Sequence, residues 1–354
     1  MRPGPTPAGR AVGRPRHTRC EKEGRRLSTQ IRLRETTAND YPELSELFAR
    51  VYPNDPPLAP ETMKWLMERG DPERPNARIV AETDGSIIGS GYLRGAPPLP
   101  DLLLNIEVDP AYRRRGIGTR LLHAVDAADE RRLPTLMMIV ETDAASLAFA
   151  RHHGFVERDR QSESVLDLAL FDPGAFADVR EAAVAQGIAF KTMAEVDSPE
   201  MRQRLFRMGD RVSQDMPTKD PLPPMTYEAF ASTWLDAPHS RPDLLVIGFD
   251  GGDPVAVSMV NVYPNGNAYN WMTGTMPSHR GRGLGLAVKV EALRRAKEAG
   301  VTEVRTDNHE RNAPMLAINR RLGYRTLPAI VWLVREPSPP TSATVRRRRT
   351  PTAK

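Results

Sequence analysis

The chain has one cysteine and no long apolar run, and these two absences exclude several classes of protein. Its single cysteine, Cys20, lies in a basic N-terminal arm, so an intramolecular disulfide is impossible, and we expect neither a cysteine-ligated metal site nor an acyl-carrying thiol. No apolar stretch approaches the roughly 18 residues that span a bilayer, and the first thirty residues lack the apolar core of a secretory signal. The histidines show no HExxH or other metal-ligand spacing. We therefore expect a soluble, cytoplasmic protein without a catalytic metal.

The net charge of +5 comes from the two ends of the chain. Residues 1–30 carry +6 and residues 337–354 carry +5, so the stretch 31–336 carries −6. Both ends are rich in Pro, Arg, Thr and Ser, a composition that cannot build a core, so we predict a disordered arm and a disordered tail. The run Arg346–Arg349 could contact nucleic acid or an anionic membrane, but a solvated tail explains it more simply. The charge is therefore no argument for a nucleic-acid enzyme.

The stretch between the two ends contains a long internal repeat. Three segments of the first half reappear in the second half in the same order; they begin at Ile31, Asn54 and Val108, and their counterparts begin at Ile188, Lys219 and Thr275. The separations are 157, 165 and 167 residues, a slow drift that fits a duplicated domain with small loop insertions. We therefore predict two domains of the same fold, at residues 31–170 and 188–336, joined by a linking helix over residues 171–187.

Each copy shows the same succession of predicted elements. A short strand, an amphipathic helix and a Pro-rich loop lead to a hairpin, which turns at Asp84-Gly85 in the first copy and at residues 250–253 in the second. A third strand then leads into a Gly/Arg-rich turn, followed by a helix, a strand, another helix and a closing strand. Because strands outnumber helices and hairpins mix with crossovers, the pattern predicts an α/β fold with a mixed sheet (α+β).

The Gly/Arg-rich turn carries the clearest chemical signal. Its residues are Arg113, Arg114, Arg115, Gly116, Ile117, Gly118 and Thr119 in the first copy, and Arg280, Gly281, Arg282, Gly283, Leu284 and Gly285 in the second. Glycine allows a tight backbone, and the unpaired N–H groups of a helix start converge where the helix dipole favours an anion. Neither turn has the Gly-Lys-Ser/Thr ending of a P-loop or the position of a Rossmann fingerprint. The pattern predicts a pyrophosphate-binding turn in each copy; ordinary helix-start glycines with surface arginines are the plain alternative.

The two R-x-x-G-x-G turns resemble the coenzyme A pyrophosphate loop of the GCN5-related N-acetyltransferases. Asn312 lies eleven residues before the pair Gly323-Tyr324, similar to that family's second motif, in which the Asn helps to hold the pantetheine and thiol end. In the first copy the pair is Gly154-Phe155, and Asp143 takes the Asn position. The resemblance covers nearly everything from Ile31 to Glu336. The two-copy arrangement of this chain is similar to that of mycothiol synthase-like and other actinobacterial tandem acetyltransferases, in which one copy can be inactive.

The resemblance also implies which groups act on the thioester. The family usually stabilises the oxyanion with a backbone N–H near Val108 and, in the second copy, near Thr275. A carboxylate on the same strand often serves as general base; Glu107 is that carboxylate in the first copy, unless it faces solvent on an edge strand. The second copy has Gly274 at this place, and His279 is either a base or a contact on the phosphate side.

Part of the family pattern is missing from both copies. The tyrosine that protonates the leaving thiolate in the family is replaced by Ala150 and by Asn319. The second copy, which keeps Asn312 and the fuller second motif, is favoured slightly as the coenzyme A binder. Which copy turns over stays open.

The resemblance implies an acetyltransferase that moves an acetyl (acyl) group from acetyl-CoA to an amine of a small molecule through a ternary complex. Acidic groups in the Pro-rich loops, Asp55, Asp215 and Asp220, would suit a cationic amine, and the tryptophans Trp65, Trp234 and Trp271 are better placed in a core than in an acceptor pocket. Two alternatives stay open: a non-catalytic acyl-CoA-binding sensor or scaffold, and an N-acetyltransferase that acts on a protein amine. We expect neither a membrane nor a nucleic acid as partner.

Overall fold

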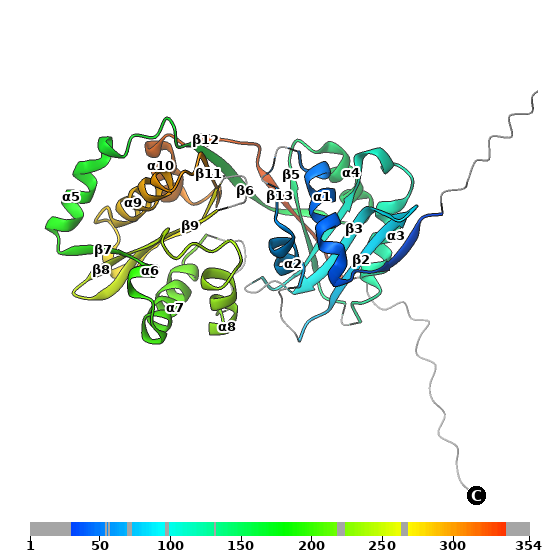
Figure 1. Ribbon diagram of the computed structural model, residues 1–354, viewed down its shortest axis with the longest axis horizontal. Helices are drawn as coiled ribbons and strands as arrows, with labels where there is room; N and C mark the ends of the chain where they lie inside the picture. The colour runs from blue at the N-terminus through cyan, green and yellow to red at the C-terminus, as the bar shows by residue number, and fades with distance from the viewer. Residues whose placement is uncertain are drawn as a thin grey trace, which may run out of the picture.

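The computed structural model describes residues 30–53, 55, 57–68, 73–95, 99–130, 132–217, 224–262 and 268–337. The predicted basic arm and tail, apart from Gln30 and Pro337, lie outside the described residues, as do Cys20 and Asp220. Within this described part, no helix is long and apolar enough to cross a membrane. Figure 1 shows the chain as two halves that lie side by side along its longest axis.

The first half follows the predicted succession of elements, with one further helix, α2, between the Pro-rich loop and the hairpin. It consists of β1 (Arg32–Glu35), α1 (Tyr41–Val51), α2 (Pro60–Glu68), β2 (Asn76–Thr83), β3 (Ser86–Gly95), β4 (Leu102–Val108), α3 (Ile117–Asp126), β5 (Thr135–Val140), α4 (Ala144–His152) and β6 (Val156–Asp167), with short 3-10 helices at Ala38–Asp40 and Pro110–Tyr112. The hairpin between β2 and β3 turns at Asp84 and Gly85, which have φ values of +50° and +81°. Two successive residues with positive φ make the tight turn that the Asp-Gly pair predicts.

The second half repeats this order after a short connection. The connection contains η3 (Pro173–Phe176) and α5 (Ala177–Ala185), and the second half consists of β7 (Ile188–Thr192), α6 (Met193–Val196), α7 (Pro199–Ser213), α8 (Tyr227–Phe230), η4 (Ala231–Leu235), β8 (Leu245–Asp250), β9 (Asp253–Val262), β10 (Ala268–Thr275), η5 (Pro277–His279), α9 (Leu284–Glu298), β11 (Glu303–His309), α10 (Ala313–Leu322), β12 (Arg325–Thr326) and β13 (Ile330–Arg335). Gly187 follows the connecting helix with a φ of +85°, the left-handed conformation in which helices commonly end.

Among the described residues, thirteen strands form one mixed sheet, which confirms the predicted α/β class. The order is β1-β2-β3-β4-β5-β13-β6-β11-β10-β9-β8-β7, and β12 also pairs with β6. Parallel pairs join β4 to β5 and β10 to β11, and the other pairs are antiparallel.

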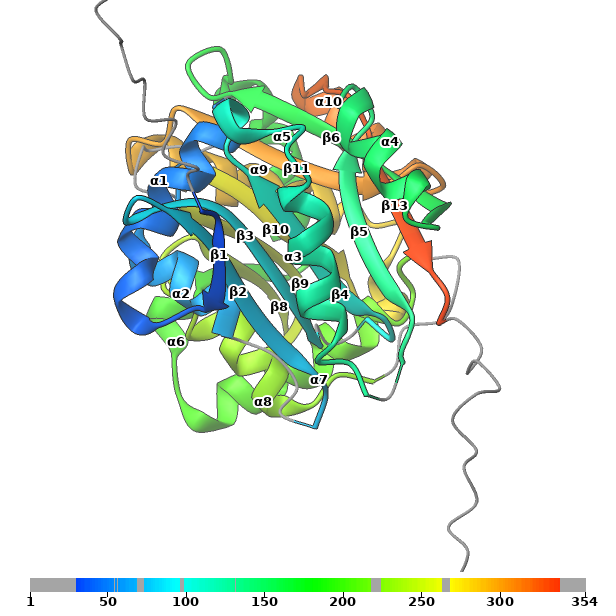
Figure 2. The same ribbon diagram turned by 90° about the vertical axis from the view of Figure 1, so that its right-hand side faces the viewer.

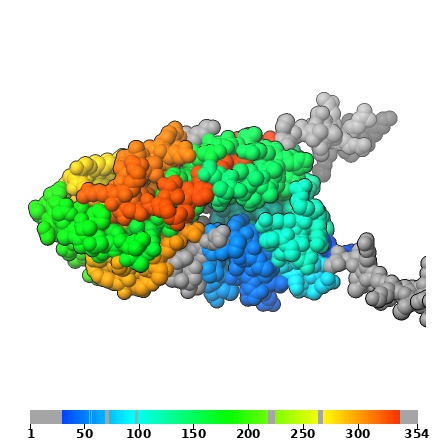
Figure 3. Space-filling view, turned by 90° about the horizontal axis from the view of Figure 1, so that it is seen from above, coloured from blue at the N-terminus to red at the C-terminus, as the bar shows by residue number. Residues whose placement is uncertain are grey.

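The two halves exchange strands at the centre of this sheet. β13, the last strand in the chain, lies between β5 and β6 and pairs with both. The first part of β6 pairs with β13, whereas residues 161–167 pair with β11 of the second half. Figure 3 shows the red C-terminal segment against the green segment around β6, between the halves. The predicted domain limits at residues 170 and 188 therefore do not divide the sheet into two. The limits themselves stay a prediction. The sequence could not indicate the exchange, because the pattern of a strand does not identify the strand with which it pairs.

Helices cover both faces of the sheet in each half. In the first half α3 and α4 pack on one face and α1 and α2 on the other, and Figure 2 shows α3 lying across the strands. In the second half α9 and α10 cover one face, and α7 and α8 the other. Each Gly/Arg-rich turn leads directly into the helix that covers its face of the sheet, α3 in the first half and α9 in the second. Both turns therefore lie at the edge of a helix-covered core.

Candidate active site

In each half, the strand that leads into the Gly/Arg-rich turn separates from its parallel neighbour. β4 pairs with β5 only at Leu102–Thr135 and Leu103–Leu136, and β10 pairs with β11 only at Ala268–Val304 and Tyr269–Arg305. Among the described residues, the remainder of β4 and β10 has no parallel partner on that side. An elongated ligand can therefore lie between the strands and meet backbone groups there.

Both turns have the backbone of an anion site. Gly116 and Gly283 precede α3 and α9 with φ values of +75° and +79°, and neither helix start has a side-chain cap. The first helical bonds run from Arg120 N to Gly116 O and from Ala287 N to Gly283 O, both at 3.1 Å. The N–H groups before these donors have no acceptor within the helix and are available to a phosphate.

The left-handed residues of the two turns match one another. Arg114 has a φ of +63° and its counterpart Gly281 a φ of +75°. A Cβ added at Gly281 or Gly283 would meet nothing within 4 Å, so the space above the second turn is open. The left-handed conformation costs a non-glycine residue roughly 1–2 kcal/mol, so the first turn bears strain that the second avoids.

The arginines of the turns are partly engaged within the protein. Arg113 Nε donates to Val108 O at 3.1 Å, and Arg280 Nε donates to Thr275 O at 3.2 Å, so the first arginine ties each turn to its strand. Arg280 also pairs with Asp215 at 2.7 Å, which places Asp215 beside the turn. Phosphate binding by these side chains stays a prediction.

Glu107 faces inward, toward α1 and α2, and its side chain is buried with the residue 6% exposed. The interpretation of a solvent-facing carboxylate on an edge strand is therefore wrong. Burial raises the pKa of Glu107 to about 8, and a hydrogen bond from Asn105 opposes this shift. The carboxyl borders a cavity of about 20 Å³ with Ser90, Tyr92 and apolar side chains of both helices, which is space for about one water molecule. Its role as base stays a prediction.

Replacing this carboxyl should change how stability depends on pH. Because the folded protein holds a proton on Glu107 up to about pH 8 and the unfolded chain releases it near pH 4.5, the free energy of unfolding falls as pH rises through this window. Between pH 4.5 and pH 9, Glu107 should lower the free energy of unfolding of the unsubstituted protein by on the order of 4 kcal/mol, and Glu107→Gln should not show this decrease. Denaturant unfolding of both proteins across this range measures it, and parallel curves for the two would contradict the buried, protonated carboxyl.

In the second half, the position that matches Glu107 is Gly274, and a side chain of α7 occupies the space beside it. A Cβ on Gly274 would overlap Cγ1 of Val212, a buried residue of α7. No side chain of any size fits at Gly274, so this strand cannot offer a base here. His279 Nδ1 lies 2.8 Å from Ser278 Oγ, and its Nε2 lies 3.2 Å from Asp250 Oδ2. Both ring nitrogens therefore have hydrogen-bond partners within the protein.

A β-bulge in β10 is a feature that the sequence did not predict. The register against β9 shifts between Asn270 and Met272, which places Trp271 at the bulge with 44% of its surface exposed. The register of β4 against β3 is regular, so the first half has no such bulge. Bulges re-aim side chains next to active sites, and this one opens the strand beside its split from β11.

Asp307 of β11 supplies a half-buried carboxyl close to the bulge. It accepts a hydrogen bond from the hydroxyl of Tyr269, and burial raises its pKa. Its cross-strand partner Glu163 also has a raised pKa, because of burial and the neighbouring carboxylates. Sequence reasoning looked for a carboxylate on β10 alone and missed Asp307; the polar alternation Arg305, Asp307, His309 was the available signal.

Asn312 and Asp143, which occupy matching positions, each cap a helix. Asn312 Oδ1 accepts from Met315 N at 3.3 Å, and Asp143 Oδ1 accepts from Ser146 N at 3.0 Å. The cap uses only the carbonyl oxygen of Asn312, so its amide donors can reach a ligand, whereas an aspartate has no such donor. The two halves therefore offer different groups at this point.

Trp65 and Asp55 of the first half contact the second half. Trp234 belongs to the core under α7 and α8, and Trp65 Nε1 donates to Ser232 O of the second half at 3.2 Å. Asp55 pairs with Arg305 at 3.0 Å. These contacts place α2 and the loop after α1 of the first half against the second half.

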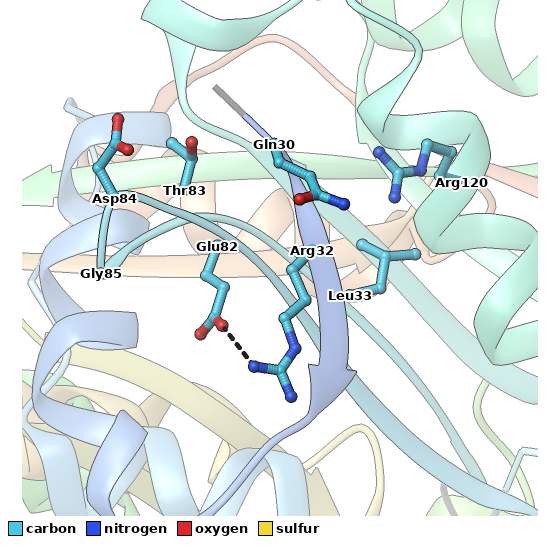
Figure 4. A pocket seen from close by; sticks show the side chains of 8 residues that line it. All are labelled: Gln30, Arg32, Leu33, Glu82, Thr83, Asp84, Gly85 and Arg120. Carbon is cyan, nitrogen blue, oxygen red and sulfur yellow. Dashed lines mark ion pairs between the residues drawn. The ribbon is translucent and has the colours of Figure 1, made fainter. Parts of the chain in front are cut away.

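A wide hollow of about 520 Å³ has none of the predicted site residues in its lining. Figure 4 shows it between β1, the β2–β3 hairpin and Arg120, with an ion pair of 3.8 Å between Arg32 and Glu82 on its wall. It includes neither turn. Among the described residues no group of His, Cys, Asp and Glu is arranged to hold a metal ion.

Comparisons with known proteins agree with the repeat. The Acetyltransferase (GNAT) family matches residues 41–155 and again residues 208–324. The mycothiol acetyltransferase of Clavibacter michiganensis subsp. michiganensis is 28% identical over 275 residues, covering 77% of this chain and 84% of that protein.

Two solved structures share the fold over most of the chain. A tandem GNAT protein from the clavulanic acid biosynthesis pathway has a TM-score of 0.71 at 22% identity, and it covers 88% of this chain and 99% of its own. A GCN5-related N-acetyltransferase from Sphaerobacter thermophilus has a TM-score of 0.64 at 18% identity, covering 86% and 95%.

Proposed function

Since this chain belongs to the Acetyltransferase (GNAT) family and is an acetyl-CoA-dependent N-acetyltransferase, we propose that its acceptor is the amine of a small molecule. The observation that supports acetyl-CoA as the donor is the uncapped glycine turn, present in both halves, at the end of a strand that separates from its parallel neighbour. Relatives that align with both halves are named mycothiol acetyltransferases, which supports a small acceptor of that kind.

We propose that the glycine turns hold the pyrophosphate and that the acyl chain lies between the separated strands. The backbone near Val108 or Thr275 then donates to the oxyanion that forms when the amine attacks the thioester carbonyl. Glu107 is the proposed base of the first half and Asp307 that of the second. Both have pKa values raised by burial, which suits acceptance of a proton near neutral pH.

The space around the two carboxyls favours transfer in the second half. The cavity beside Glu107 holds about one water molecule, because α1 and α2 fill the acceptor side of the first half with apolar side chains. The second half has the bulge, the exposed Trp271 and the Tyr269–Asp307 pair on its acceptor side. We infer that the first half binds acetyl-CoA mainly as a structural ligand.

Calorimetric titration with acetyl-CoA, read for stoichiometry, tests the proposal. We expect two sites, one for each glycine turn, and steady release of free thiol when a panel of small amines is added. A single site would mark one turn as structural, and the absence of binding would overturn the proposed function. Binding without thiol release for any amine would favour an acyl-CoA sensor.

Transfer to a protein amine is a second candidate. N-alpha-acetyltransferase RimI of Mycobacterium tuberculosis is 34% identical over 123 residues, but these cover only 34% of this chain. Thiol release with N-terminal peptides and not with small amines would favour this candidate.

A further inference from the structure

The second half contains a buried lysine on its cofactor-facing helix. Lys289 of α9 is 1% exposed, and its Nζ donates to Asn319 Oδ1 of α10 at 2.7 Å. Asn319 Nδ2 donates in turn to Asn308 Oδ1 of β11 at 2.7 Å. Nζ also lies 4.8 Å from the centre of the Tyr324 ring, and the buried hydroxyl of Tyr324 has no hydrogen-bond partner in the described structure.

In the first half, the positions equivalent to Lys289 and its neighbours all carry apolar side chains. The equivalents of Lys289, Asn308, Asn319 and Tyr324 are Leu122, Ile139, Ala150 and Phe155, and all four belong to one core cluster. The fold therefore does not need a polar group here. Burying an ammonium beside neutral amides is unfavourable by several kcal/mol, so this lysine needs an explanation other than packing.

The position of Lys289 connects it to the glycine turn. Gly285 and Lys289 lie four residues apart on one face of α9, about 6 Å along the helix axis. A Cβ on Gly285 would lie 3.4 Å from Thr275 Oγ1 and 3.6 Å from Ile318 Cδ1, so α9, the end of β10 and α10 converge there. Asn319 follows Ile318 directly, so the lysine and its amide lie just beneath the turn.

The network also borders the split between β10 and β11. Asn308 lies three residues beyond Arg305, the last residue of β11 that pairs with β10. Thr306 Oγ1 still reaches Asn270 O at 3.1 Å across the narrow end of the split. The Lys289–Asn319–Asn308 network therefore lies between the narrow end, where the strands are still joined, and the glycine turn at the open end.

We propose that Lys289 is a positioning residue that fixes Asn319 and places a positive charge beside the sulfur of coenzyme A when it leaves as thiolate in the second half. The inference rests on the proposed function. In the transfer, the amine nitrogen forms a bond to the acyl carbon, the carbon–sulfur bond breaks with its electron pair moving to sulfur, and the amine proton passes to a base. A nearby cation stabilises the sulfur anion, and low polarity makes the interaction stronger.

The titration of Lys289 fits this role. Burial lowers the pKa of its amine to about 7, so the charge depends on what lies beside it. Among the described residues, Tyr324 is the titratable group that faces Nζ, and burial raises the pKa of its phenol far above the usual range. The other two members are neutral amides. A bound thiolate would therefore be the anion that holds the proton on Lys289.

The test replaces the network with the residues of the first half. Lys289→Leu and Asn319→Ala are made in a Gly116→Glu background, so that coenzyme A binds through the second turn only. At about pH 7.5, where a free thiol such as that of cysteine (pKa about 8.5) is mostly protonated, the Lys289 form should bind coenzyme A with the ultraviolet absorbance of a thiolate and about tenfold more tightly than acetyl-CoA. Lys289→Leu should lose the thiolate band and this preference, and keep its acetyl-CoA affinity within about twofold.

Acetyl-CoA has the same phosphates as coenzyme A but no free thiol, so it serves as the matched control ligand. An equal loss of affinity for both ligands would assign the charge to the phosphates and overturn the proposal, as would unchanged spectra and affinities. Lys289→Met provides a second, unbranched variant if leucine impairs folding. Failure of the unsubstituted protein to bind acetyl-CoA would contradict the proposed function itself; acetyl-CoA binding without the thiolate band would contradict only this inference.

Discussion

Gly283→Glu is expected to abolish acetyl-CoA binding by the second half. Gly283 has a φ of +79° and lies at the start of α9, where an added Cβ would meet nothing within 4 Å, so a glutamate would enter the space where a phosphate is expected. The side chain brings left-handed strain and a negative charge to the same N–H groups. We expect at least about a 100-fold loss of affinity, about 2.7 kcal/mol, measured by calorimetry.

Three variants separate charge from strain in this experiment. Gly283→Ala introduces the strain without the charge and should lose less affinity. Gly300→Glu places the same residue at a φ of +85° in open space beyond the far end of α9, and should leave binding unchanged. Gly116→Glu should remove only the site of the first half. If Gly283→Glu and Gly116→Glu both bind acetyl-CoA normally, the turns do not hold the phosphates. Thiol release by each variant also shows which half turns over.

Gly274→Ala is expected to destabilise the protein by about 3 kcal/mol, at the upper end of the usual range for overpacking a core. The added methyl would overlap Cγ1 of Val212, which belongs to the core between α7 and the sheet. Neither element can move easily, because β10 is hydrogen-bonded to β9 on one side and α7 is packed on α8. Chemical denaturation measures the difference in the free energy of unfolding.

The double variant Val212→Ala/Gly274→Ala identifies the cause. Removing the clashing methyl groups should recover most of the stability lost in Gly274→Ala, so the two substitutions should be strongly non-additive. Additive losses would mean that the strand does not lie as close to α7 as described. The same contact explains why the carboxylate of the first half cannot simply be transplanted into the second: Gly274→Glu would destabilise the core before it could act as a base.

Local features of the fold followed directly from the sequence. The Asp84-Gly85 hairpin, the two glycine turns and the repeated order of elements depend on backbone conformation and short-range periodicity, which a sequence states explicitly. Gly116 and Gly283 were predicted to lie in turns that lead into helices, and both directly precede a helix with positive φ.

Strand pairing and the buried polar groups did not follow from the sequence, because they depend on contacts between distant segments. The segments at β6 and β13 each have the pattern of a closing strand, and nothing in their alternation indicates that they pair across the halves. Glu107 could not be oriented for the same reason. Two charged residues, Lys289 and Glu291, are buried on α9. Glu291 has arginine partners on the same helix, whereas Lys289 comes between Val288 and Val290 in the sequence, and that charge within an apolar run was the available sign of an unusual environment.

The exchange of strands affects the order in which the protein can be made and the freedom of its two copies to diverge. During synthesis, the first half leaves the ribosome with an open edge on β5 that is filled only when residues 330–335 emerge. An unfilled edge invites pairing with other chains, so the nascent first half is vulnerable until the second has been translated. Neither copy can be deleted without opening the sheet of the other. A copy that lost turnover would therefore be retained for its part in the shared sheet.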